Sequence, residues 1–151
     1  MSAHQPAKPR VLVDANVLIN VLLSPDPRRS AAAALLAEAE RGTFSLVRPF
    51  EPIEVVERIA IEKPRLTGRI PPAAVEQLVA VLSRIAEVAP RLEVSPPRFV
   101  RDPGDDYLLA QALLADVDVL VTRDKDLLDI VAVGATRIVD PSTLLQHLRG
   151  E

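Results

Sequence analysis

Short apolar runs alternate with longer amphipathic segments along this chain of 151 residues. The first run, Val11-Leu12-Val13, is mostly β-branched, which is typical of a strand buried on both faces. Further strands are predicted at Phe44 to Val47, at Val117 to Thr122 and at Thr136 to Val139. Because helical patterns separate these strands, the sequence predicts an α/β fold. We expect a three-layer α/β/α arrangement around a central, mainly parallel sheet.

The predicted helices follow from apolar spacing and from breaker residues at their ends. They are an apolar helix after Asp14, Pro27 to Arg41 with a stop at Gly42, Phe50 to Ile61, a helix opened by Pro71-Pro72 and ended by Pro90, a helix headed by Asp105 or Asp106, and a last helix opened by Asp140-Pro141-Ser142.

The length and the 48% hydrophobic content suit one domain that buries its own core. We expect residues 1–9 to be a disordered tail and residues 10–151 to form that domain. The absence of cysteine excludes disulfides, a thiol nucleophile and a Cys-based zinc site. No apolar run approaches the ~20 residues of a membrane-spanning helix, and the first ten residues do not resemble a signal peptide. A cytoplasmic protein is therefore expected.

Charge and motif content narrow the chemistry. The chain has 18 basic and 21 acidic residues, so it is not a polycation built to coat nucleic acid, and any contact with nucleic acid must be local. His4 and His147 lie near the termini, and there is no nucleophile elbow, P-loop or dinucleotide-binding fingerprint. A metal-assisted reaction is the class that remains.

Carboxylates recur at the ends of predicted strands. Asp14 and Asp124 each follow a buried-looking strand, Asp105 or Asp106 heads a helix, and Glu54 lies on a helix after a third strand. Capping of the next helix is the alternative role for Asp14. If four acids converged they would raise one another's pKa, a cost that a divalent cation relieves. An all-oxygen site suits Mg²⁺ or Mn²⁺ better than zinc.

These residues resemble the PIN-domain ribonucleases, a family that includes the toxins of many toxin-antitoxin pairs. The resemblance covers roughly residues 10 to 140. It rests on Asp14-Ala15-Asn16-Val17-Leu18, on Glu54, on the pattern from Asp105 through Ala112, and on Val121-Thr122-Arg123-Asp124-Lys125-Asp126-Leu127. Two residues depart from the family pattern. Arg48 stands where a Ser or Thr often precedes the helix with the Glu, and Arg123 replaces a small residue.

The resemblance implies a single PIN-like nuclease domain that cleaves RNA with Mg²⁺ or Mn²⁺. Its catalytic acids are Asp14, Glu54, Asp105 and Asp124, of which Asp14, Asp105 and Asp124 are the implied metal ligands. Glu57 or Glu51 could replace Glu54 in this role, and Asp106 could replace Asp105. It also implies a small antitoxin protein as partner, and a homodimer is possible.

Other side chains are expected to support this site. Asn16 and Thr122 would orient the carboxylates. Asp126 is either a further ligand or a solvated acid at a helix start. Arg123 and Lys125 flank Asp124 and are candidates to bind the RNA backbone.

More remote basic groups, Arg28-Arg29 and Lys63-Arg65-Arg69, are weaker candidates for RNA contact, because surface charges are usually only solvated.

Two rival functions stay open at this point. A phosphoacceptor receiver domain also places acids at strand ends, but it needs an acidic pair near the first strand and a Lys after the last, and the chain has neither. A catalytically silent PIN-like module that binds proteins would keep the same fold. Intact acids argue against it.

Overall fold

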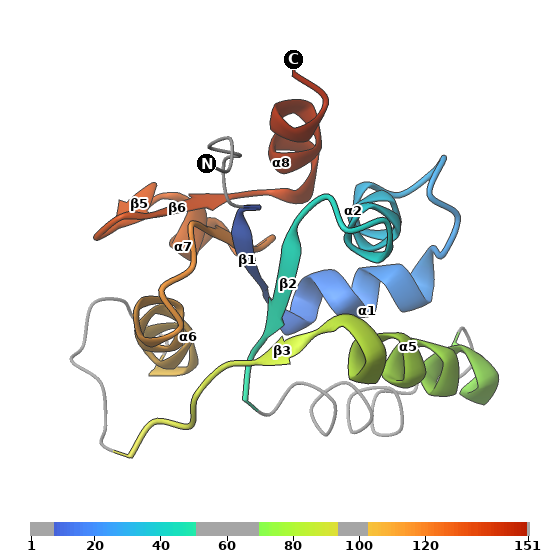
Figure 1. The fold of residues 1–151 in the computed structure, drawn as a ribbon, viewed down its shortest axis with the longest axis horizontal. Helices are drawn as coiled ribbons and strands as arrows, with labels where there is room; N and C mark the ends of the chain where they lie inside the picture. Colours follow the sequence, from blue (N-terminus) through green and yellow to red (C-terminus); the bar gives the residue numbers. More distant parts are fainter. Residues whose placement is uncertain (1–7, 51–69, 94–102, 151) are drawn as a thin grey trace, which may run out of the picture.

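The computed structural model describes residues 8–50, 70–93 and 103–150, and these residues form one six-stranded sheet with helices on both sides (Figure 1). In chain order the elements are β1 (Arg10–Val13), α1 (Ala15–Leu23), α2 (Ala31–Glu40), β2 (Ser45–Arg48), α5 (Pro72–Ile85), β3 (Glu87–Val88), α6 (Pro103–Leu114), β4 (Val119–Val121), α7 (Lys125–Leu128), β5 (Ala132–Val133), β6 (Thr136–Val139) and α8 (Pro141–Leu148).

The strand order is β3-β2-β1-β4-β6-β5, and every pairing is parallel except that of β5 with β6. The α/β class and the mainly parallel sheet predicted from the sequence are therefore confirmed. β1 lies inside the sheet between β2 and β4, and Val11, Leu12 and Val13 are all buried. The expectation that this strand is covered on both faces is correct.

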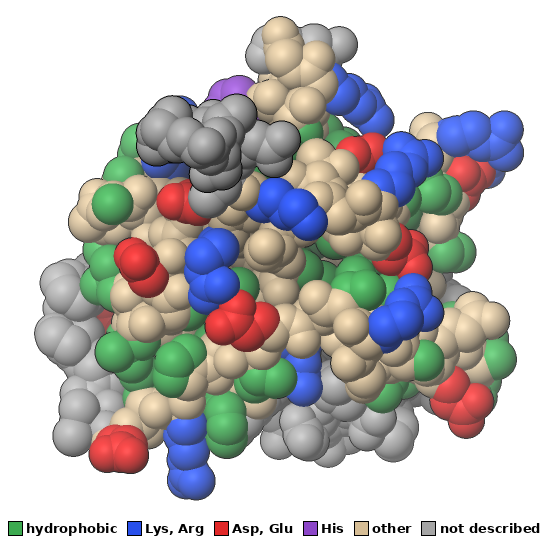
Figure 2. Space-filling view, viewed as in Figure 1, with side chains coloured by type: hydrophobic (Ala, Val, Ile, Leu, Met, Phe, Trp, Pro, Cys, Tyr) green, Lys and Arg blue, Asp and Glu red, His purple; other side chains and the backbone are tan. Residues whose placement is uncertain are grey.

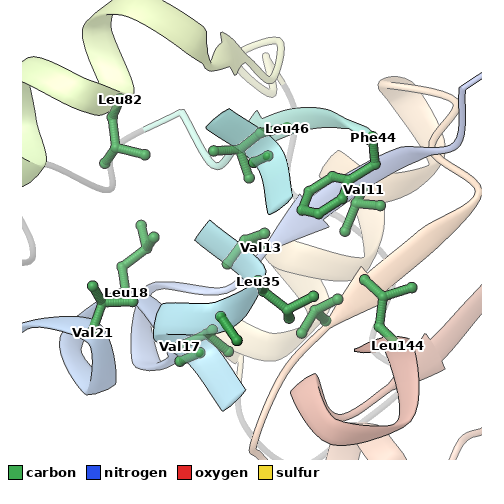
Figure 3. Packing of buried hydrophobic residues seen from close by; sticks show 14 of the residues in the cluster. Val11, Val13, Val17, Leu18, Val21, Leu35, Phe44, Leu46, Leu82 and Leu144 are labelled. Atoms are coloured by element: carbon green, nitrogen blue, oxygen red, sulfur yellow. The ribbon is translucent and has the colours of Figure 1, made fainter. Parts of the chain in front are cut away.

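Alternate residues along the strands face two separate hydrophobic clusters. Val11 and Val13 of β1 belong to the cluster that α1, α2, α5 and α8 complete, whereas Leu12 belongs to the one completed by α6 and α7. Figure 3 shows the first cluster, in which Val11 and Val13 of β1 lie among side chains from α1, α2, α5 and α8. A single strand therefore anchors helices above and below the sheet, as the period-2 alternation of strand side chains requires.

Successive strands are added on opposite sides of β1. The connection that contains α1 and α2 leads to β2 on one side, while β4 pairs with the other side of β1. In open parallel sheets ligands bind at such a switch point, beyond the carboxyl ends of the strands. The residues that follow β1 and β4 lie at this position.

The second helix starts later than the sequence predicts. α2 begins at Ala31 rather than at Pro27, because Ser30 accepts a hydrogen bond from the Ala33 N–H at 3.2 Å and so caps it. The predicted stop is confirmed, since Gly42 has a φ of 81°, a conformation that favours glycine at a helix end.

The sequence does not predict the two shortest strands, and for the short helix α7 it indicates only a helix start at Asp126. The helix opened by Pro71-Pro72 ends at Ile85 rather than at Pro90, and the residues in between contain β3. β3 and β5 have two residues each and α7 has four, which is too short for an apolar period to show. The predicted strand Val117 to Thr122 shortens to β4, whereas Thr136 to Val139 is confirmed as β6.

Asp105 and Asp106 lie within the first turn of α6, because this helix begins at Pro103. Neither of them therefore occupies the N-cap position, the structural role that an acid at the head of a helix suggests. The predicted helix Phe50 to Ile61 extends past residue 50 into a segment outside the described residues, as does most of the expected tail.

Candidate functional site

Asp14 follows β1 directly and begins α1. Its backbone N–H donates to the Val121 carbonyl of β4 at 3.0 Å, which continues the parallel pairing of Val13 with Val121. Its Oδ1 accepts from the Asn16 N–H at 3.5 Å, a long contact that makes Asp14 the N-cap of α1. The capping role considered from the sequence is thus present, and it places the carboxylate at the carboxyl edge of the sheet.

Thr122 joins the two strand ends. It follows β4, is fully buried, and its hydroxyl donates to Asp14 Oδ2 at 2.8 Å. The hydroxyl oxygen of Thr122, Oγ1, also accepts hydrogen bonds from the Asp124 N–H at 3.0 Å and from Asn16 Nδ2 at 3.4 Å. One side chain therefore fixes the carboxylate of Asp14 and the backbone of Asp124.

Asp124 repeats the arrangement of Asp14 on the neighbouring strand. It is the N-cap of α7, and its Oδ1 accepts from the Asp126 N–H at 2.9 Å. Leu127 of this short helix is completely buried, which anchors α7 against the sheet. The side chain of Asp126 is exposed.

Asn16 connects α1 to the loop after β4. Its Oδ1 accepts from the Arg123 N–H at 3.3 Å, while its Nδ2 donates to Thr122. One turn later, Asn20 donates from Nδ2 to the Asn16 carbonyl at 2.9 Å. No sequence motif points to Asn20, although its spacing of four residues from Asn16 places both on one helix face.

Burial dominates the electrostatics of Asp14. Loss of solvation raises the pKa of this carboxyl above its usual value, and the charge of Asp124 raises it further. Hydrogen bonds from Thr122 and from the Asn16 backbone oppose this shift. The negative form is therefore disfavoured at a place where an oxygen-preferring cation would stabilise it.

The structure brings Asp14 and Asp124 together, but the part of the chain that it describes gathers no complete metal site. In residues 8–50, 70–93 and 105–150 no three His, Cys, Asp or Glu side chains could jointly hold an ion. Asp105 is half-buried and Asp106 is buried, both at the start of α6. Glu54, with its alternatives Glu51 and Glu57, lies outside the described residues, so the four-acid set stays a prediction.

The carboxylate pair itself fits a hard divalent cation. Its donors are oxygens, with no imidazole or thiolate among them, which suits Mg²⁺ or Mn²⁺ rather than zinc.

Basic side chains near the pair are exposed. Arg123 forms no salt bridge in the described parts of the chain, either with the nearby Asp126 or with another acid. Lys125 is the first residue of α7 and is also exposed. Figure 2 shows Lys and Arg interspersed with Asp and Glu over one face of the protein, with no large area of a single sign.

We predict that Thr122→Val lowers the free energy of unfolding by about 1–3 kcal/mol, because the partly buried N–H of Asp124 and the oxygen of Asp14 both lose their partner. The substitution should also raise the pKa of Asp14 further. Urea denaturation and an NMR titration of the Asp14 carboxyl measure the two effects. Thr122→Ser is the matched control, since it keeps the hydroxyl; an equal pKa change in both variants would contradict the assigned hydrogen bond.

Stability without metal should fall as pH rises through the window above 3.8, the ordinary pKa of Asp14, up to its raised value in the folded state. The reason is that the folded protein holds this proton more tightly than the unfolded chain does. Asp14→Asn removes the effect, so the variant should gain stability relative to the wild type as pH increases. Urea unfolding in a chelator across this range tests it, with the exposed Asp129→Asn as control. A constant difference between wild type and Asp14→Asn would refute the assignment.

Within the described residues, no helix is long and apolar enough to span a membrane. No curated protein matches the chain significantly. The model of the PIN domain matches residues 10–126, a span that begins with β1 and includes Asp14, Thr122 and Asp124. Because this match covers well over half of the 151 residues, the chain belongs to the PIN-domain family, whose members are typically metal-dependent nucleases.

Proposed function

We propose that this protein is an endoribonuclease that uses Mg²⁺ or Mn²⁺ and acts as the toxin of a toxin-antitoxin pair. The observation that carries the proposal is the carboxylate pair of Asp14 and Asp124, held by Thr122 at the switch point of the sheet in a PIN domain. Burial of Asp14 beside a second acid is costly unless a cation is bound there.

Asp14 and Asp124 would hold the cation, with Asp105 and Glu54 as the further candidates. When bound, such an ion lowers the pKa of a water and neutralises charge that develops on phosphate oxygens. The chain's own part is to orient the ligands. Thr122 fixes one oxygen of Asp14, and Oδ1 makes a long contact of 3.5 Å to the Asn16 N–H. Asn16 in turn holds the backbone of Arg123 beside the pair.

Family membership bears on one of the two rival functions that the sequence left open. A match to the PIN domain over residues 10–126 argues against a phosphoacceptor receiver. The silent PIN-like module remains as the alternative outcome of the activity test.

Asp14→Asn should abolish Mg²⁺-dependent cleavage of RNA while the protein stays folded, because Asn keeps a capping oxygen but removes the charge that binds the ion. Cleavage of a mixed-sequence RNA and circular dichroism measure the two properties. Mn²⁺ binding, followed by electron paramagnetic resonance, gives a readout independent of turnover. Asp129→Asn removes one charge from an exposed position and should retain activity. Full cleavage by Asp14→Asn, or none by the wild type, would exclude the proposed enzyme.

A ribonuclease of this kind would harm its host if it were not inhibited, so we expect a small antitoxin that covers the acidic pair. A basic side chain of that partner can occupy the place of the cation, because Arg forms paired hydrogen bonds with carboxylates. Purification of the natively expressed protein should therefore yield a small second chain, and Mn²⁺ should compete with it. Harmless expression of an active enzyme without any partner would contradict the toxin role.

Arg123→Ala should raise KM for RNA with little change in kcat, which is the result of losing binding that is equal in the ground and transition states. The slope of the logarithm of the binding constant against the logarithm of the salt concentration should become shallower by roughly 0.7, because the variant neutralises one phosphate fewer on a single strand. Binding measured from low to high salt tests this. Arg137→Ala is the control, because Arg137 is an exposed cation near the amino end of β6, away from the acids. Identical slopes for wild type and Arg123→Ala would rule out a phosphate contact.

A further inference from the structure

A surface pocket of about 200 Å³ lies at the carboxyl edge of the sheet. It is formed by the loop after β4, by α7, and by the starts of α2 and α8. Its lining residues are Ala31, Arg123, Leu128, Asp140, Pro141 and Ser142. We call it the β4–β6 pocket.

Strand register places this pocket beside the acidic pair. Val121 of β4 is aligned with Val139 of β6, and the Thr122 N–H donates to the Val139 carbonyl at 3.1 Å. Asp140 therefore follows β6 as Arg123 and Asp124 follow β4. Leu128 belongs to the helix that Asp124 caps, so one wall of the pocket is attached to a candidate metal ligand.

The lining combines a cation, a carboxylate and an apolar wall. Arg123 is exposed and has no salt bridge in the described residues, so its guanidinium is available to a phosphate. Asp140 accepts from the Thr143 N–H through Oδ1 at 2.8 Å, and for its second oxygen the described residues provide no donor. A carboxylate accepts hydrogen bonds only, so this oxygen suits a hydroxyl or N–H group.

A bare phosphate fits this lining poorly, because it would meet the negative charge of Asp140. A nucleotide carries an anionic phosphate for Arg123 together with donors on its sugar or base. Leu128 and Pro141 offer apolar surface against which a sugar or base can pack. The volume is below the ~300–1,000 Å³ of sites for drug-sized ligands, which favours one nucleotide unit rather than a longer segment.

We propose, on the basis of the function proposed above, that the β4–β6 pocket holds one nucleotide of the RNA beside the scissile phosphate. Arg123 binds a phosphate of this nucleotide, and Asp140 accepts a hydrogen bond from its 2′-hydroxyl or from an N–H group of its base. Asp140 thereby makes binding depend on the sugar or on the base.

The test is an NMR titration of the metal-free protein with the four ribonucleoside 5′-monophosphates, their 2′-deoxy forms and inorganic phosphate. The backbone amides of Arg123, Leu128 and Ser142 report on the pocket. We expect them to shift saturably with nucleotides and more weakly with phosphate. Arg123→Ala should weaken binding of all nucleotides by about tenfold, as expected when a charged hydrogen bond is removed.

Asp140→Asn is the decisive variant. Asn keeps an oxygen for the Thr143 N–H, so α8 stays capped, but it puts a donor in place of the second acceptor. If the variant prefers ribonucleotides over deoxyribonucleotides less than the wild type does, the partner of Asp140 is the 2′-hydroxyl. If instead the order of affinity for the four bases changes, the partner is the base. Asp129→Asn makes the same change in charge at the far end of α7 and should alter neither ratio.

Three results would overturn the proposal: pocket amides that do not shift, phosphate that binds as well as nucleotides, or Asp140→Asn with unchanged sugar and base preferences. None of these measurements uses catalysis. If the pocket binds nucleotides as expected but the protein does not cleave RNA, only the proposed nuclease function is wrong. If the protein cleaves RNA but the pocket does not bind nucleotides, only the proposed role of the pocket is wrong.

Discussion

The hydroxyl of Thr122 is the group on which the arrangement of the site depends. A hydroxyl has one hydrogen to donate and two lone pairs to accept with, and here all three are used, by Asp14, Asp124 and Asn16. These bonds are possible only because β1 and β4 are adjacent, parallel and in a register that ends both strands at the same level. The order and register of the strands thus determine how the carboxylates of Asp14 and Asp124 lie relative to each other.

This geometry works against stability, and the rest of the fold compensates. A buried carboxyl beside another acid is unfavourable in its charged form. The strands that carry the acids are held by apolar layers on both faces, with Val13 and Val121 on one and Leu120 on the other. Because these strands are tightly packed, they can hold the two carboxylates close together although the negative charges repel each other.

Local patterns predict the elements that the core defines. The run Val11-Leu12-Val13 correctly indicates a doubly buried strand, and the predicted bounds of β6 are correct, because apolar residues report burial directly. The predicted start of α2 is too early because Pro27 suits the first position of a helix, although Ser30 is the residue that caps it. β3 and β5 escape prediction because two residues are too few to show an alternating pattern. In addition, β3 pairs with β2, which is distant in sequence, whereas β5 pairs with β6 directly after it.

The site shows the same division. Short motifs in the sequence indicate Asp14, Asp124, Asn16 and Thr122 as candidates, and the structure joins these four residues in one hydrogen-bonded group. For Asp140 the sequence indicates only the start of a helix. Its position beside Arg123 follows from the register of β4 with β6, which no local pattern contains.

Asp14, Asp124 and Asp140 share a property that bears on how this chain can change over time. Each caps the helix that follows it, so each contributes to folding independently of any ligand. Replacement by alanine would cost roughly 1 kcal/mol of helix stability at each position in addition to any chemical loss. A gene copy released from selection for chemistry would therefore remain under selection for capping. The substitutions that such a copy tolerates at these three positions are Asn, Ser and Thr, because they also cap helices. An inactive copy that still folds would therefore keep small polar residues at all three strand ends.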